Sequence, residues 1–178
     1  EDILGQLSGH VAIGQTRYST TGSSIVVNAQ PLLERSDLGD FAFAHNGNLT
    51  NTDELRESLA PTTVLQATSD SEVMAKLIVE SKGSMLDRIA SVLSVARGAY
   101  SIVLCTQAEL YAFRDPWGVR PLCLGKLADN GGYVVASESC ALGTIGAQYV
   151  REIGRGEIIR ISGEGLESRI VEVEGAQP

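Results

Sequence analysis

Three short segments of the chain carry side chains that could bind a free amino acid and stabilise an oxyanion beside it. A guanidinium such as that of Arg17 can bind an α-carboxylate, and a carboxylate such as that of Asp70 can bind an α-ammonium. The pair Asn46-Gly47 can offer two N–H donors to a developing negative oxygen. The segments are RYSTTG (residues 17–22), HNGN (residues 45–48) and TSDSE (residues 68–72).

Each of these segments also has a purely structural interpretation. Arg17 fits a surface charge beside a Ser/Thr/Gly turn, since charged residues are mostly exposed. Asn-Gly is the usual signal of a hairpin, and Asp70 in a first helical turn stabilises that helix through its dipole. Against the surface interpretation, the stretch between His10 and Arg35 contains no other acidic or basic residue than Arg17 and Glu34. The functional interpretation therefore depends on the combination of segments.

The composition is that of a globular protein with one core. The chain has 178 residues, of which 43% are hydrophobic and 20% are charged, enough for one ordinary domain. The net charge of −8 comes without a cluster of Lys and Arg, which argues against a nucleic-acid partner. No apolar run is long enough to span a membrane, and the acidic N-terminal stretch is not a signal peptide. We expect neither a nucleic-acid nor a membrane partner.

The cysteines indicate a reducing compartment. Cys105, Cys123 and Cys140 are odd in number, widely spaced and without a CxxC pair. This pattern argues against a disulfide framework or a zinc site, so we expect a cytoplasmic protein with no metal bound by this chain.

The pattern of the elements predicts an α+β fold with helical layers packed on sheet. Strands are expected at residues 10–19 and 41–45, the second ending on Asn46-Gly47 at a strand-to-helix turn. Capping-box spacing at Asn51 and Ser69, and a capping residue at Ser84, predict three helices, the last stopped by Gly98. Further strands are expected at residues 99–105, 109–115, 120–125, 132–138, 156–162 and 166–173, with a short helix at residues 140–146.

The order of the motifs closely resembles the class II glutamine amidotransferase domain of the amidophosphoribosyltransferase family. The segments that carry this resemblance are TRYSTTG, NAQPL, HNGNLTN, TSDSE, RDPWGVRPL and VVASESCAL, and they cover essentially the whole chain. The resemblance implies the N-terminal-nucleophile αββα sandwich. It also implies that Arg17 and Thr20 bind the α-carboxylate of L-glutamine, that Asp70 binds its α-ammonium, and that Asn46 and Gly47 form the oxyanion hole.

The nucleophile of that family has no counterpart in the chain. Family members begin with a catalytic cysteine whose α-amino group acts as the base, whereas this chain begins at Glu1 and its three cysteines do not align with it. We therefore expect residues 1–178 to be a partial type-2 glutamine amidotransferase domain, incomplete at its N-terminus and inactive alone.

The resemblance also sets expectations for the parent protein. It would carry a phosphoribosyltransferase domain, absent from this chain, and would convert glutamine, phosphoribosyl pyrophosphate and water to 5-phosphoribosylamine, glutamate and diphosphate, the first committed step of purine synthesis. We expect no cofactor in this chain, Mg²⁺ and in some members an iron–sulfur cluster in the phosphoribosyltransferase part, and a homo-oligomeric parent.

Two alternatives remain open. Another class II amidotransferase, of the glucosamine-6-phosphate synthase type, usually has Trp, His and His where this chain has Tyr18, Thr21 and Gln30. A domain without a nucleophile that only binds an amino acid would also retain Arg17 and Asp70.

Overall fold

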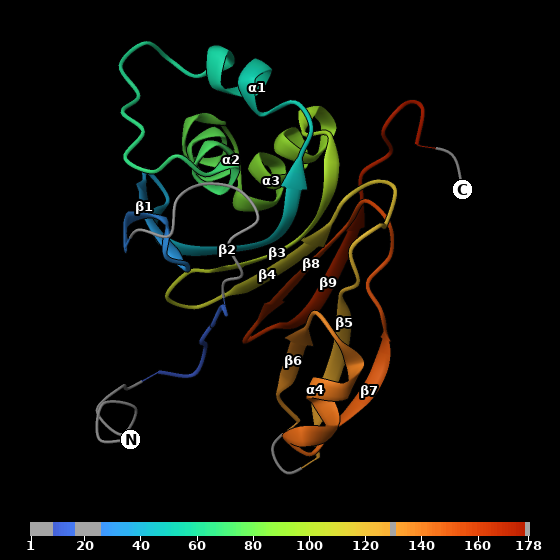
Figure 1. Cartoon of the computed structure of the whole chain (residues 1–178). Coiled ribbons are helices and arrows are strands. Elements are labelled where there is room, and N and C mark those ends of the chain that lie inside the picture. Colours follow the sequence, from blue (N-terminus) through green and yellow to red (C-terminus); the bar gives the residue numbers. More distant parts are fainter. Residues whose placement is uncertain (1–8, 17–25, 129–130, 177–178) are drawn as a thin grey trace.

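The computed structural model describes residues 9–16, 26–128 and 131–176. Within these ranges there are two antiparallel sheets, a six-stranded sheet in the order β1-β2-β3-β4-β8-β9 and a three-stranded sheet in the order β6-β5-β7. In Figure 1 the large sheet crosses the middle of the molecule and the small sheet lies below it. The large sheet consists of β1 (Leu32–Ser36), β2 (Gly39–Leu49), β3 (Gly98–Cys105), β4 (Leu110–Arg114), β8 (Glu157–Ser162) and β9 (Gly165–Ile170). The small sheet consists of β5 (Cys123–Leu127), β6 (Tyr133–Ala136) and β7 (Ala147–Glu152).

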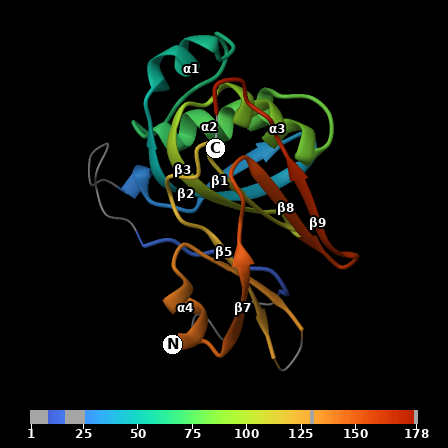
Figure 2. The ribbon, with the colours of Figure 1, turned by 90° about the vertical axis from the view of Figure 1, so that its right-hand side faces the viewer.

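Helices cover the outer faces of the two sheets. The helices α1 (Thr52–Ser58), α2 (Asp70–Glu80) and α3 (Met85–Val95) lie on one side of the large sheet, and the small sheet lies on its other side (Figure 2). The helix α4 (Ser139–Thr144) packs on the small sheet, where Leu142 forms a small core with Cys123 and Ala147. The layers therefore run helix, sheet, sheet, helix, which confirms the predicted α+β sandwich.

Alternating side chains on the large sheet fill two separate cores. On β4, Tyr111 and Phe113 pack against the helices, whereas Ala112 between them faces the small sheet, as the two-residue period of a strand requires. Buried residues of the helix-side core come from α2, α3 and the large sheet, including Met74, Ile89, Phe43 and Ile158. The core between the sheets contains Leu122, Leu124, Ile153 and Ile159.

One of the three predicted helix starts has the predicted cap. Ser84 precedes α3, and its hydroxyl accepts the N–H of Asp87 while the Asp87 carboxylate accepts the N–H of Ser84. The helix ends at Val95, before Gly98, so the prediction that Gly98 stops it was wrong. Gly98 instead begins β3.

The capping boxes predicted at Asn51 and Ser69 are not formed. Asn51 precedes α1, but its side chain donates to the carbonyl of Val95 and accepts the N–H of Arg97. Glu72 accepts the N–H groups of Gln66 and Ala67, in the loop before α2. In both places the side chain binds a backbone group outside its own helix.

The strand that contains the Asn-Gly pair is longer than predicted. β2 continues through Asn46 and Gly47 to Leu49, paired throughout with β3, so the expected strand-to-helix turn at Asn46-Gly47 is wrong. The two backbones approach closely here: a Cβ on Gly47 would lie 2.1 Å from the carbonyl oxygen of Ala99. Both Gly47 and Gly98 have positive φ, 143° and 144°, a conformation that glycine adopts without steric cost.

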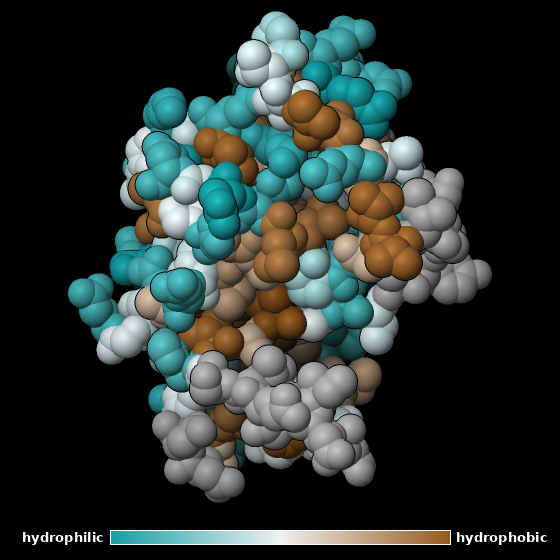
Figure 3. All heavy atoms as spheres, turned by 90° about the vertical axis from the view of Figure 1, so that its left-hand side faces the viewer, coloured by the Kyte–Doolittle hydropathy of each residue, from teal (hydrophilic) through white to brown (hydrophobic). Residues whose placement is uncertain are grey.

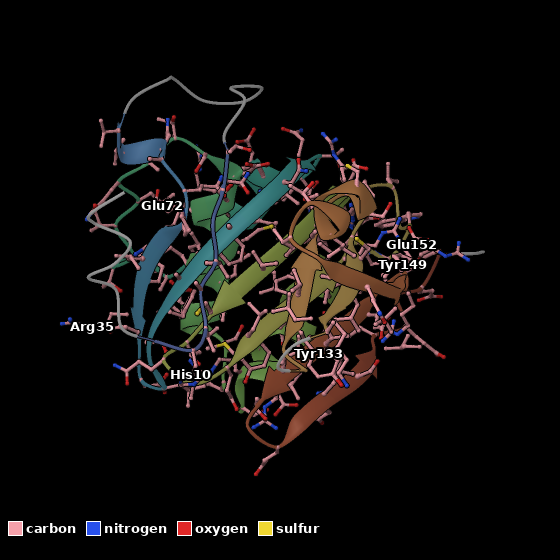
Figure 4. The ribbon with its side chains drawn as sticks, turned by 90° about the horizontal axis from the view of Figure 1, so that it is seen from below. His10, Arg35, Glu72, Tyr133, Tyr149 and Glu152 are labelled. Atoms are coloured by element: carbon pink, nitrogen blue, oxygen red, sulfur yellow. The ribbon has the colours of Figure 1, made fainter. Side chains whose placement is uncertain are left out.

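Residues 10–16 form no strand in the structure, so that part of the strand predicted at residues 10–19 is wrong; the rest of it lies outside the described residues. No described strand pairs with this segment, but the side chain of Gln15 donates to the carbonyl of His45 at 3.2 Å. Seen from below, the segment beginning at His10 runs across the large sheet on the face that the small sheet also covers (Figure 4). Apolar side chains gather in the middle of the molecular face shown in Figure 3.

Replacing Gly98 by Ala should destabilise the chain by about 2 kcal/mol or more. The new Cβ would lie 2.3 Å from the carbonyl oxygen of Asn48 and would hold a strained positive φ of 144°. Urea unfolding of the purified chain measures the loss. The matched control is Gly163→Ala, because a Cβ on Gly163 meets nothing within 4 Å; equal stabilities of the two variants would contradict the close approach.

Candidate active site

The strand β2 places His45 and Asn46 on opposite faces of the large sheet. His45 is 4% exposed, and its ring meets that of Tyr100 edge-on with centroids 6.3 Å apart on the helix side. Asn46 lines a cavity of about 120 Å³ between the sheets, together with Ala44 and Ser101. The predicted oxyanion donor thus faces the space between the sheets. No other described residue forms a hydrogen bond with its side chain.

Asp70 joins the start of α2 to the end of β2. It is the first residue of α2 and is 5% exposed. Its Oδ2 accepts the N–H of Leu49 at 2.9 Å, and its Oδ1 lies 3.8 Å from Nδ1 of His45. In the part of the chain that the structure describes, no hydrogen bond reaches Oδ1. One carboxylate oxygen is therefore used by the fold and the other remains for a cation.

Hydrogen bonds link His45 to Ser71 and Gln30. Its Nδ1 lies 3.0 Å from Oγ of Ser71, which accepts the side-chain N–H of Gln30 at 3.0 Å. Oε1 of Gln30 accepts the backbone N–H of His45 at 2.6 Å. Burial lowers the pKa of His45, and the nearby Arg120 lowers it further while Asp70 opposes both. His45 is consequently neutral at pH 7, and its Nε2 has no partner among the described residues.

Two residues of the NAQPL segment, Asn28 and Gln30, support the site, although the sequence pattern had assigned them no role in it. Asn28 accepts the N–H of Thr68 at 3.1 Å and donates to its hydroxyl at 3.3 Å, just before Asp70. Gln30 holds His45 and Ser71, as described above. The signal that could have found both residues is their place in the ordered series of motifs. Arg17 and Thr20, the predicted carboxylate ligands, lie outside the described residues.

Arg114 and Asp115 brace the turn of the RDPWGVRPL segment. The Asp115 carboxylate accepts the N–H groups of Trp117, Val119 and Tyr100. Arg114 donates to the carbonyl of Ile153 at 3.0 Å and pairs with Glu152 at 2.7 Å. These contacts tie the turn to both sheets and involve none of the predicted substrate groups.

The three thiols are poor candidates for a nucleophile. Burial raises the pKa of Cys105 and of Cys123, and the thiolate is the reactive form. Cys140 is exposed on α4. Among the described residues no group of three or more His, Cys, Asp or Glu could hold a metal ion, and no helix of the described ranges is long and apolar enough to cross a membrane.

A family model described as a glutamine amidotransferase domain matches residues 16–144. The chain belongs to the glutamine amidotransferase domain family. Within this family, amidophosphoribosyltransferases are close relatives of this domain. That of Synechococcus elongatus is 51% identical over 173 residues, which are 94% of this chain and 35% of that protein. That of Methanocaldococcus jannaschii is 42% identical over 164 residues, 90% of this chain and 34% of that protein.

A solved structure of the same kind matches this glutamine amidotransferase domain. It is the glutamine phosphoribosylpyrophosphate amidotransferase from B. subtilis, complexed with ADP and GMP, with a TM-score of 0.81 and 41% identity. The match covers 89% of this chain and 34% of that one, and it confirms the predicted N-terminal-nucleophile sandwich. The chain spans about a third of the length of these relatives.

Replacing His45 by Gln should make the unfolding free energy depend less on pH in the acidic range. The unfolded chain takes up a proton at this histidine near pH 6.5, whereas burial lowers its pKa in the folded chain. The unfolding free energy should therefore fall below about pH 6.5, by at most ~1.4 kcal/mol per pH unit, until the folded pKa is reached. Urea unfolding at about pH 5 and about pH 7.5 measures this difference.

The matched control is His10→Gln, because His10 is exposed and the chain has only these two histidines. The unfolding free energy of this variant should depend on pH as that of the unaltered chain does. The same loss of stability at low pH in His45→Gln and in the unaltered chain would contradict a buried neutral His45.

Proposed function

We propose that this chain is the glutaminase part of an amidophosphoribosyltransferase. It binds L-glutamine and supplies ammonia for the conversion of phosphoribosyl pyrophosphate to 5-phosphoribosylamine. The observation that carries the proposal is the arrangement at the end of β2. There the amide of Asn46, which no other described residue bonds, lines a cavity. Three residues later the N–H of Leu49 anchors Oδ2 of Asp70, and no described residue donates to Oδ1.

Each end of glutamine has a proposed partner. The free oxygen of Asp70 takes the α-ammonium, and Arg17 with Thr20 takes the α-carboxylate. When a cysteine thiolate attacks the carboxamide carbon, the carbonyl oxygen becomes negative, and the amide of Asn46 and the N–H of Gly47 stabilise that charge. Ammonia leaves, and water hydrolyses the thioester to glutamate.

The nucleophile and the acceptor reaction belong to parts outside this chain. The family resemblance assigns the role of nucleophile to an N-terminal cysteine. None of the three thiols of this chain is among the residues that line the cavity with Asn46. The proposed parent is a cytoplasmic homo-oligomer with a phosphoribosyltransferase domain, which binds Mg²⁺. In some members that part carries an iron–sulfur cluster, and no residue of this chain is assigned to either group.

Asp70→Asn in the full-length protein should lower synthesis with glutamine and leave synthesis with ammonium unchanged. The Asn side chain can still accept the N–H of Leu49, so the fold keeps its contact while the negative charge is lost. Leaving the substrate ammonium unpaired should cost ~2–5 kcal/mol, roughly a thirtyfold to several-thousandfold loss. Arg17→Ala should cause the same selective loss, because the α-carboxylate of glutamine then lacks its proposed partner. Product formation is measured with glutamine and, separately, with concentrated ammonium salt, which bypasses the pocket.

Asp87→Asn is the matched control, since Asp87 lies in the first turn of α3 as Asp70 does in α2. It should leave both activities unchanged. Equal losses with glutamine and with ammonium in Asp70→Asn would mean that this carboxylate only supports the fold.

Asn46→Ala should have a different signature. It should lower the turnover of glutamine by ~10²–10³ and change KM little, because an oxyanion donor acts mainly in the transition state. Steady-state kinetics of glutamate release in the full-length protein separate the two constants. A rise in KM without loss of turnover would assign Asn46 to ground-state binding. Glutamine binding without any turnover in the unaltered full-length protein would favour the binding-module alternative.

A further inference from the structure

One hydroxyl in the cavity between the sheets has no hydrogen-bond partner. Ser101 on β3 is 3% exposed, and its Oγ has no hydrogen-bond partner in the described structure. The cavity of about 120 Å³ that it lines is bounded on the large sheet by Ala44 and Asn46 and on the other side by Val135 and Ser137. A buried hydroxyl without a partner is unfavourable and calls for an explanation.

Ser101 lies directly across from Asn46. The register of β2 and β3 pairs these two residues, and side chains of directly opposed residues project from the same face of the sheet as close neighbours. Both line the same cavity. Among the described residues, the hydroxyl and the amide without hydrogen-bond partners are therefore cross-strand neighbours that line one cavity.

The amide of Asn46 needs a fixed orientation to serve as an oxyanion donor. Its two ends have nearly the same shape, but only Nδ2 donates hydrogen bonds, whereas Oδ1 would repel a negative oxygen. No hydrogen bond from a described residue selects between the two orientations. A hydroxyl that donates to Oδ1 would make the selection, because it leaves Nδ2 to face the substrate.

We propose that Ser101 is a positioning residue for Asn46, its hydroxyl donating to Oδ1 and directing Nδ2 to the carboxamide oxygen of glutamine. The inference rests on the proposed glutaminase function. The two groups do not bond in the present arrangement, and hydrogen bonds of a catalytic site commonly form only once the substrate is bound. The serine hydroxyl changes its direction by rotation about one bond, without movement of the strand.

The other polar side chains of the cavity are less suited to this role. Gln15 already donates to the carbonyl of His45. Ser137 follows β6 on the opposite sheet, whereas Ser101 is held in register with Asn46 by the ladder itself. Ser101 is also the one serine on the large sheet that lines the cavity, within the described residues.

The test compares Ser101→Ala with Ser101→Thr in the full-length protein. Loss of one neutral hydrogen bond should lower kcat for glutamine hydrolysis about three- to tenfold, with KM within about twofold. Ser101→Thr keeps the hydroxyl and should restore kcat to within about twofold. Adding Ser101→Ala to Asn46→Ala should cause no further loss, because the hydroxyl acts only through the amide.

Tyr100→Phe is the matched control. Tyr100 is the neighbouring residue of β3, and its buried hydroxyl also lacks a partner, but its side chain packs in the helix-side core. This variant should leave kcat unchanged. Neither Tyr100→Phe nor Ser101→Ala should lower the thermal midpoint, since each removes an unpaired hydroxyl, and ammonium-dependent synthesis should be unaffected by both.

Each other outcome overturns the inference in a recognisable way. A full further loss in the double variant would mean that Ser101 contacts the substrate independently of Asn46. An unchanged kcat in Ser101→Ala, or equal losses with glutamine and ammonium, would remove the positioning role and leave the proposed function intact. An unaltered full-length protein that hydrolyses no glutamine would overturn the proposed function and the inference together.

Discussion

The close approach of β2 and β3 at Gly47 and Gly98 is the constraint on which the site depends. A Cβ on either glycine would meet the opposing backbone, at 2.1 Å and 2.3 Å respectively, so only glycine allows the ladder to continue to Leu49. Beyond the ladder, Asn51 binds the carbonyl of Val95 and the N–H of Arg97. The end of β2 is therefore fixed by its backbone, and the side chains and N–H groups that it carries have fixed directions.

A fixed strand end explains how Asp70 can serve the fold and a ligand at once. Its Oδ2 meets the N–H of Leu49, a buried donor that needs an acceptor. Once that bond is made, the helix start at α2 and the strand end at β2 are held together, and Oδ1 has a defined position 3.8 Å from His45. A carboxylate at a helix N-terminus is stabilised by the helix dipole as well. The structural and functional interpretations of Asp70 are complementary for this reason.

The sequence predicted what depends on local pattern and missed what depends on distant partners. The cap at Ser84 involves a neighbour three residues away, and this prediction is confirmed. The cap at Asn51 failed because its side chain binds residues more than forty positions away. Asn46-Gly47 resembled a turn because Asn-Gly is a common turn signal between strands, whereas here the glycine permits close pairing with a distant strand. The roles predicted for Arg17, Thr20, Asp70, Asn46 and Gly47 stay predictions.

The neutrality of His45 has a consequence for the proposed site. A protonated imidazole 3.8 Å from Oδ1 of Asp70 would pair with that oxygen and compete with the α-ammonium of the substrate. Burial lowers the pKa of His45 and removes this competitor at neutral pH. Ser71 contacts the neutral ring at Nδ1, and Gln30 accepts the backbone N–H of His45. On the helix side of β2, the neutral His45 with Ser71 and Gln30 thus keeps one carboxylate oxygen of Asp70 available. Asn46, on the other side of the same strand, faces the cavity. The rigid end of β2 therefore fixes both proposed contacts to one amino acid: its Leu49 N–H holds Asp70 of α2, and its own residue Asn46 supplies the hydrogen-bond donor.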